Sequence, residues 1–201
     1  MTRTAQLHSP TKERLLDAAQ QRMLAKGFAA TTVDEICEAA KLTKGSFFHY
    51  FESKDELGKV LLERFCDSGA RMIEAWCGNE RDPLKRVFRY IDAFAQMSQD
   101  PVLGKGCLLG CFTQELSDTH PQIRAVCCQR FETWAKQFGQ DLARAKAQYA
   151  PKASFRPQEL AEHFIAILEG SMILGKARQD MKVVAQNLRH FKMYLNALLK
   201  R

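Results

Sequence analysis

The chain has 201 residues, of which 46% are hydrophobic and 26% are charged, and its formal net charge is +7. This length supports one or two domains with a substantial core. No apolar run reaches the roughly 18 residues of a membrane-spanning helix, so we expect no membrane partner. The polar first residues lack a secretory apolar region, and seven cysteines without a signal peptide indicate free thiols in a reducing cytoplasm.

The net charge alone does not indicate a nucleic-acid partner. Residues 1–60 hold nine Lys and Arg against eight Asp and Glu, whereas residues 61–201 hold 21 against 15. A diffuse excess of this kind is typical of a solvated surface. The window 39–51 is different, because it contains Lys41, Lys44 and His49 and no acidic residue. A DNA-binding prediction therefore depends on this local placement.

A first helix is predicted to begin at Pro10, which suits an opening turn, and to end before Gly27, which suits a helix C-terminus. Its apolar residues fall on one face: Leu15, Leu16, Ala19, Met23 and Leu24. This face predicts a scaffold helix that packs behind the two short helices that follow.

A short second helix is predicted after Thr32, whose hydroxyl can accept a backbone N–H of the opening turn. Glu35 lies three residues later, which completes a capping box. The apolar residues of this helix also share one face: Val33, Ile36, Cys37 and Ala40. We therefore expect one side of the helix to be buried.

A third helix of about two turns is predicted after Thr43, a second good N-cap. Phe47 and Phe51 point to the core, whereas Lys44, Gly45 and Phe48 point the other way. The next helix is capped by Ser53, with Glu56 as a second capping box and Lys54 in its first turn.

The open face of the third helix suits a DNA major groove, as in helix-turn-helix proteins. Lys44 can reach a guanine edge, and Gly45 allows close approach. His49, Tyr50 and Lys54 are placed to bond phosphates. The alternative is a small helical hairpin on the surface with a few solvated charges.

A family resemblance favours the DNA-binding interpretation. Over about residues 10–57, the chain resembles the N-terminal domain of TetR/AcrR-type repressors, and the matching motifs are KGF (26–28), TTV (31–33), ICEAA (36–40), TKGSFFHYF (43–51) and SK (53–54). Members of that family are all-helical homodimers that release an operator when a small molecule enters the C-terminal domain.

The resemblance implies base-region contacts from Lys44 and Gly45. It implies phosphate contacts from five further residues: Thr32, Ser46, His49, Tyr50 and Lys54. Thr43, the cap of the recognition helix, and Phe48 on its open face complete the predicted DNA-binding set. Phe48 stands where the family often has Tyr, and it lacks the hydroxyl that would make one of the phosphate contacts.

The rest of the chain predicts an all-α fold. Further helices are expected at about 54–79, 83–98, 107–116, 120–148, 158–176 and 184–198. We predict a helix-turn-helix DNA-binding domain over 1–53 and a ligand-sensing and dimerisation domain over 54–201, with the 54–79 helix as a lever. Too little chain remains to cover the apolar stripes of the last two helices, which favours a four-helix interface with a second copy. The alternative is that they close the core of one chain.

Two cysteines mark the second informative stretch. Cys107 and Cys111 are four residues apart on one predicted helix, and Cys107 lies at its start, where the helix dipole favours a thiolate. Residues 106–108 and 115–117 resemble a subgroup of the family that senses electrophiles or oxidants through cysteine. Lys176 is a cation that could approach this region. The alternative is that Cys107 is an inert, buried residue that lines a pocket.

Two alternative functions would also use cysteine and histidine side chains. A metal-responsive regulator could use Cys107, Cys111 and His120 as thiolate and imidazole ligands, although a C-x3-C pair with one distant His is a weak pattern. A thiol enzyme would need a base such as His120 or His163 held by a third group. The chain has no Gly-rich phosphate loop and no H-E-x-x-H motif, so we expect neither an enzyme nor a cofactor.

The sequence therefore predicts a sequence-specific transcriptional regulator, a repressor released by a small apolar or electrophilic effector or by modification of Cys107. Its expected partners are a palindromic double-stranded DNA operator, the effector and a second copy of the chain. The predicted effector pocket is lined by Phe65, Met97, Cys107, Cys111, Phe112, Trp134, Phe164 and Met172.

Overall fold

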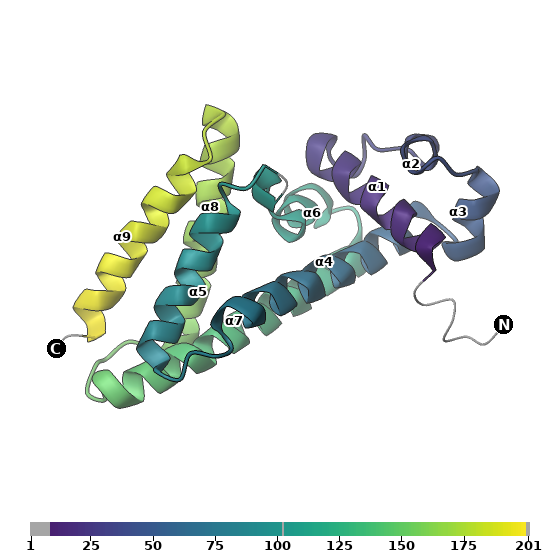
Figure 1. The fold of residues 1–201 in the computed structure, drawn as a ribbon. Coiled ribbons are helices and arrows are strands. Elements are labelled where there is room, and N and C mark those ends of the chain that lie inside the picture. Colours follow the sequence, from purple (N-terminus) through teal and green to yellow (C-terminus); the bar gives the residue numbers. More distant parts are fainter. Residues whose placement is uncertain (1–8, 102, 200–201) are drawn as a thin grey trace. The chain divides into compact units, whose positions relative to one another are not determined.

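A computed structural model describes residues 9–101 and 103–199, and it confirms the all-helical fold (Figure 1). The helices of the described residues are α1 (Pro10–Lys26), α2 (Val33–Ala40), α3 (Lys44–Tyr50), α4 (Lys54–Cys77), α5 (Pro83–Met97), the 3-10 helix η1 (Leu103–Lys105), α6 (Leu108–Leu116), α7 (Pro121–Tyr149), α8 (Pro157–Arg178) and α9 (Lys182–Leu199). No helix in this part of the chain is long and apolar enough to cross a membrane.

The chain forms two compact units. The first contains the described residues of Met1–Asp67 together with Leu108–Cys128, and the second contains Ser68–Cys107 and those of Gln129–Arg201. The long helices α4 and α7 each contribute to both units. The packing boundary thus differs from the predicted functional boundary between residues 53 and 54, which stays a prediction.

Local signals set the ends of α1 and the start of α2 as predicted. Pro10 lies in the first turn of α1, and Gly27 follows its last residue with a φ of 91°, a value that favours glycine. At α2, the Thr32 hydroxyl accepts the backbone N–H of Glu35, and the Glu35 carboxylate accepts the backbone N–H of Thr32. The predicted capping box is therefore confirmed.

The caps of α3 and α4 are confirmed in part. The Thr43 hydroxyl accepts the Ser46 N–H at 3.1 Å, and the Ser53 hydroxyl accepts the Glu56 N–H at 3.1 Å. The Glu56 carboxylate, however, accepts the N–H of Glu52 at 2.6 Å. The predicted return bond of this capping box, from the Ser53 N–H to the Glu56 carboxylate, was wrong, because the chain before α4 presents the Glu52 amide to Glu56 instead.

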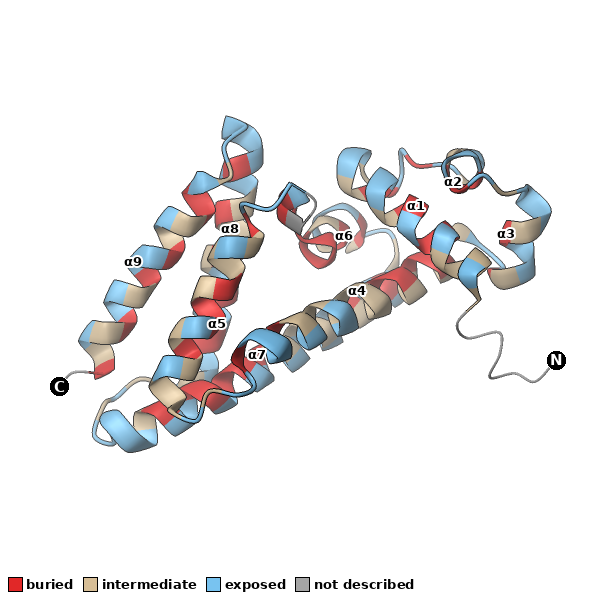
Figure 2. Cartoon of the chain, in the orientation of Figure 1, coloured by how far each residue is buried: buried red, intermediate tan, exposed pale blue. Residues whose placement is uncertain are grey.

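Aromatic residues hold the core of the second unit. Tyr90 of α5 stacks on Phe138 of α7 with ring centroids 4.2 Å apart, and Phe164 of α8 contacts both rings. Phe191 of α9 contacts the Phe164 ring and so extends this cluster to α9. Buried residues recur along α5 and α9 with exposed residues between them, as expected for amphipathic helices (Figure 2). Trp76 of α4 is 41% exposed.

Candidate nucleic-acid interface

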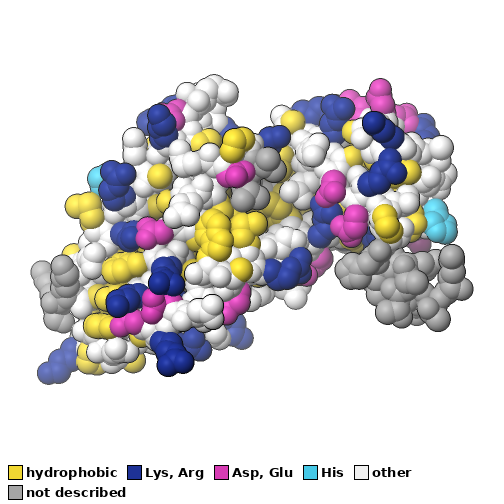
Figure 3. Space-filling model, viewed as in Figure 1, with side chains coloured by type: hydrophobic (Ala, Val, Ile, Leu, Met, Phe, Trp, Pro, Cys, Tyr) yellow, Lys and Arg dark blue, Asp and Glu magenta, His cyan; other side chains and the backbone are white. Residues whose placement is uncertain are grey.

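Helix α3 has one buried side and one open side. Phe47 is fully buried and Phe48 is 57% exposed, although they are adjacent in the chain. Lys44, Gly45 and His49 are also exposed. Basic and acidic side chains lie together over the visible face of the first unit (Figure 3). The open side of α3 is therefore available to an external partner, and its apolar back is held by the core.

Lys44 makes an ion pair that the sequence reasoning missed. Its ammonium lies 2.8 Å from the Asp34 carboxylate of α2, and both side chains are more than 60% exposed. The hydrogen bond to Asp34, together with the charge of that carboxylate, raises the pKa of Lys44. The cation that is predicted to contact bases is thus paired with an acidic side chain before any DNA is bound.

Four hydroxyls of the predicted set have local partners. The hydroxyls of Thr43 and Ser46 lie 3.1 Å apart, and that of Thr32 lies 3.1 Å from the Glu35 carboxylate. Tyr50 is half-buried, and its hydroxyl lies 2.8 Å from the Ser9 hydroxyl. These contacts fix the side chains at the protein surface, and their phosphate contacts stay predictions.

Lys54 binds the protein's own backbone. Its ammonium donates to the carbonyls of Phe28 and Thr31, each at 3.0 Å, and lies 4.4 Å from the centre of the Phe28 ring. The side chain therefore holds the turn between α1 and α2. A phosphate contact from Lys54 remains a prediction, and it would have to be made in addition to these bonds.

Helix α6 holds the same turn from another side. The Glu115 carboxylate accepts the backbone N–H groups of Phe28 and Ala29, each at 2.7 Å. A Cβ at Gly27 would lie only 2.9 Å from this carboxylate, so glycine also permits the close approach. Phe112 of α6 packs edge-on against Phe28. No local sequence pattern could have identified this contact, because Glu115 lies 87 residues from Phe28.

The predicted effector-binding residues fall in different surroundings. Phe112 packs in the first unit, whereas Phe164 lies in the core of the second, and the Trp134 indole N–H there donates to the Tyr90 hydroxyl at 2.5 Å. Met97 and Met172 lie against that second core, and Phe65 and Cys111 are half-buried. Nothing in this arrangement tests whether an effector binds, so the pocket stays a prediction.

Cys107 is 9% exposed and directly precedes α6. Its thiol lies within hydrogen-bonding reach of the Glu169 carboxyl group. Burial raises the pKa of Glu169, against the opposing effects of the Cys107 hydrogen bond and the Lys176 charge. One Glu169 oxygen is buried with no hydrogen-bond partner in the described chain. Lys176 also reaches Gly106, where an added Cβ would lie 3.0 Å from its ammonium. A thiol, a carboxyl group and an ammonium thus gather here.

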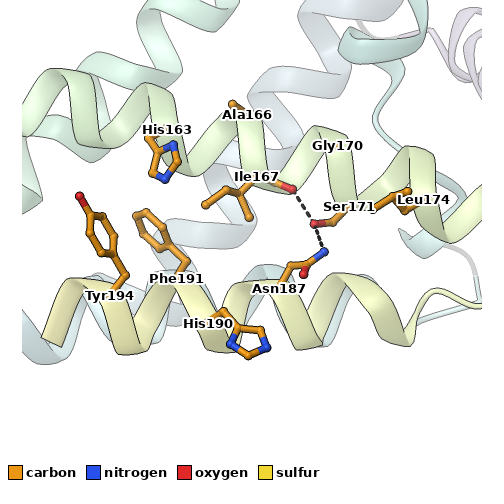
Figure 4. Close-up of a pocket in the computed structure, with 10 residues that line it drawn as sticks. All are labelled: His163, Ala166, Ile167, Gly170, Ser171, Leu174, Asn187, His190, Phe191 and Tyr194. Carbon is orange, nitrogen blue, oxygen red and sulfur yellow. Dashed lines mark hydrogen bonds between the residues drawn. The ribbon is translucent and has the colours of Figure 1, made fainter. Parts of the chain in front are cut away.

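An open groove of about 600 Å³ runs along α8 and α9 (Figure 4). The Ser171 hydroxyl donates to the Ile167 carbonyl and accepts from the Asn187 amide at 2.9 Å. His163 and Tyr194 line the groove nearby, together with Ala166, Gly170, Leu174, His190 and Phe191. None of its lining residues belongs to the predicted effector set.

The metal hypothesis gains no support from the described residues, among which no three His, Cys, Asp or Glu side chains form a group that could hold a metal ion. His120 is engaged elsewhere, because its Nδ1 lies 2.8 Å from the Thr119 hydroxyl and its ring packs edge-on against Phe28.

Comparisons with known proteins agree with this arrangement. Residues 15–59 match the family model of bacterial regulatory proteins of the tetR family, and residues 83–191 match that of the tetracyclin repressor-like C-terminal domain. The chain is 31% identical over 169 residues to the transcriptional regulator AcuR of Cereibacter sphaeroides, covering 82% of this chain and 75% of AcuR.

It is also 25% identical over 190 residues to the transcriptional repressor NemR of Escherichia coli, covering 90% of this chain and 92% of NemR. Among solved structures, regulatory protein TetR from Rhodobacter sphaeroides superposes with a TM-score of 0.84 at 28% identity, covering 92% of this chain and 99% of that one. TetR-family regulators are not enzymes. The chain therefore belongs to the TetR family, as a DNA-binding transcriptional repressor.

Proposed function

We propose that this repressor binds a palindromic operator as a homodimer, places α3 of each copy in the major groove, and releases the DNA in response to a chemical signal. The signal is a small apolar or electrophilic effector, or modification of the Cys107 thiol. The proposal needs no cofactor, and it locates the protein in the cytoplasm with the chromosome.

The open side of α3 is the observation that carries the DNA part of the proposal. Phe47 and Phe51 anchor the helix through buried rings, while Lys44, Gly45 and His49 remain exposed. In helix-turn-helix proteins the second helix lies in the major groove, and residues of its first turns contact base edges. Neighbouring hydroxyls, such as that of Tyr50, would bind phosphates and fix the register.

Exposed apolar side chains support dimerisation through α8 and α9. Ile173 and Leu174 on α8 are 49% and 42% exposed, and Met193 and Tyr194 on α9 are 62% and 48% exposed. Single exposed apolar residues are ordinary, but four on two adjacent helices are typical of a covered surface. A second copy related by a two-fold axis would bury the same patch on both chains.

The surroundings of Cys107 support release by thiol chemistry. Thiolate is the reactive form of cysteine, and nearby cations favour it. Lys176 provides such a cation beside Gly106, and the Glu169 carboxyl group lies within hydrogen-bonding reach of the thiol. One solved structure of the relative NemR is described as its reduced form. An apolar effector that binds without bond formation is the other route to release.

Fluorescence anisotropy on DNA from upstream of the protein's own gene would test the proposal. The purified protein would be titrated with N-ethylmaleimide, for the wild type and for Cys107→Ser. We expect the wild type to release the DNA and the Ser variant to retain it. Retention by both would reject the thiol route and direct the search to non-covalent apolar ligands. If neither protein binds this fragment, a duplex selected from a random library would replace it.

A further inference from the structure

An acidic residue lies where the protein is expected to read bases. Asp34 stands in the first turn of α2, and its carboxylate reaches Lys44, the first residue of α3, at 2.8 Å. A carboxylate near DNA is repelled by the phosphates, so simple attraction to the backbone does not account for an acid at this position. Together with Lys44, however, it forms a pair that carries no net charge.

The two acids of this turn have different surroundings. Glu35 binds groups of the protein itself, because its carboxylate accepts the backbone N–H of Thr32 and lies 2.5 Å from the Lys26 ammonium. These hydrogen bonds, with that to Lys26 the largest, lower the pKa of Glu35 to about 2. Asp34 instead is 64% exposed and faces the first turn of α3. Glu35 therefore serves the helix cap, whereas Asp34 is available to an external partner.

The chemistry of the pair matches one kind of base pair. In the major groove, guanine presents two acceptors, O6 and N7, and cytosine presents the N4 amino donor. An ammonium suits the guanine edge and a carboxylate suits the cytosine amino group. A carboxylate has about four acceptor positions, so its contact with Lys44 leaves capacity for a base.

We propose that Asp34 is a specificity-determining residue that accepts a hydrogen bond from a cytosine N4 amino group while Lys44 donates to guanine in the same or the adjacent base pair. This inference rests on the proposed placement of α3 in the major groove. It assigns to α2 a part in base reading beyond its part as a support for α3.

Selection of binding sites from a randomised duplex library would test the role of Asp34, with the wild type, Asp34→Ala and Asp34→Asn compared. We expect Asp34→Ala to lose the preference for C·G at one position of each half-site and to bind the wild-type site about tenfold more weakly. Asn suits adenine rather than cytosine, so Asp34→Asn should shift the preference at that position. Binding to unrelated DNA should not weaken in either variant, because one negative charge has been removed.

The matched control is Glu38→Gln, which removes an exposed acid from the same helix without disturbing the pair with Lys44. It should change affinity for all duplexes alike and leave the selected site unchanged. Two outcomes would overturn the proposal. If Asp34→Ala binds every duplex more tightly with the same preference, Asp34 only restrains Lys44. If it binds all duplexes more weakly, with a lowered melting temperature, its role is structural.

Discussion

Lys54 illustrates how one side chain can belong to both the fold and the interface. Family resemblance predicts a phosphate contact, yet the ammonium donates to the Phe28 and Thr31 carbonyls at 3.0 Å. An ammonium has three donors, and a third carbonyl, that of Ala29, lies 3.5 Å away. The long bond to Ala29 is the one that a phosphate could replace.

Substitution of Lys54 should therefore affect stability as well as DNA binding. We expect Lys54→Met to lower the free energy of unfolding by about 1–3 kcal/mol, because charged hydrogen bonds to a partly buried turn are lost. If a phosphate contact exists, the salt dependence of DNA binding should also fall by about one phosphate. Urea unfolding and anisotropy at several salt concentrations measure the two effects. Arg22→Ala, which removes an exposed cation from α1, is the control. A loss of stability with an unchanged salt slope would leave Lys54 with a structural role alone.

The Glu169 carboxyl group should make the stability of the second unit depend on pH. Burial raises its pKa above the ordinary 4.5, while Cys107 and Lys176 oppose that effect. Below the ordinary value the carboxyl group is neutral in both the folded and the unfolded chain. As the pH rises through the folded value, the unfolded chain ionises more readily, and the stability contributed by the neutral group is lost.

The variant Glu169→Gln cannot ionise, so its stability relative to the wild type should increase as the pH rises from 4.5 to 8. Urea unfolding at both pH values measures this difference, and Glu162→Gln, an exposed neighbour on α8, controls for the loss of a surface charge. A difference that stays constant between the two pH values would show that Glu169 does not titrate in this range.

At the scale of the elements, α6 belongs with the DNA-binding helices. It lies in the first compact unit, and Glu115 and Phe112 join it to the turn between α1 and α2. Cys107 is the residue directly before α6. A chemical change at Cys107 would thus act on the chain at the start of a helix that holds the DNA-binding turn.

Loss of the Glu115 carboxylate should loosen this turn. We expect Glu115→Ala to lower the free energy of unfolding by about 1–3 kcal/mol, since the Phe28 N–H would lose its charged acceptor in a partly buried position. Hydrogen exchange should accelerate at the amides of Phe28 and Ala29 in particular. Gln114→Ala, at the adjacent exposed position, should change neither quantity. Unchanged exchange at both amides in Glu115→Ala would contradict the role given to this carboxylate.

At the scale of the whole molecule, the proposed dimer would make DNA binding depend on dimerisation. Two recognition helices on a two-fold axis read half-sites about one helical turn apart, and the spacing depends on the dimer interface. A variant that cannot dimerise would have to bind one half-site, which loses the gain in effective concentration from linking two sites.

The double variant Leu174→Glu with Met193→Glu should therefore be monomeric and bind the operator at least tenfold more weakly. Both side chains are exposed in the single chain, so the substitutions should not disturb the packing within it, and the melting temperature of the monomer should change little. Sedimentation velocity measures the oligomeric state and anisotropy measures the affinity. Lys152→Glu, in the loop before α8, changes an exposed charge away from both helices and is the control. A dimer that persists in the double variant would exclude this face as the interface.

The amino-acid sequence by itself determined the helices and the limits of most of them. Pro10, Gly27, Thr32 and Thr43 act within one turn of their own positions, so their effects follow from neighbouring residues. The motifs around α3 likewise lie within one short stretch, which is why the family and its DNA-binding role were predictable from them.

Only the tertiary structure decided which side chains meet across helices. Lys44 pairs with Asp34, and Lys54 binds the turn at Phe28. Glu115 of α6 binds the same turn. The division of the chain into units, with α6 beside the DNA-binding helices, has the same origin. These contacts join residues 10 to 87 positions apart, and they depend on how amphipathic helices bury their apolar faces together. Periodicity identifies those faces but does not specify which faces meet.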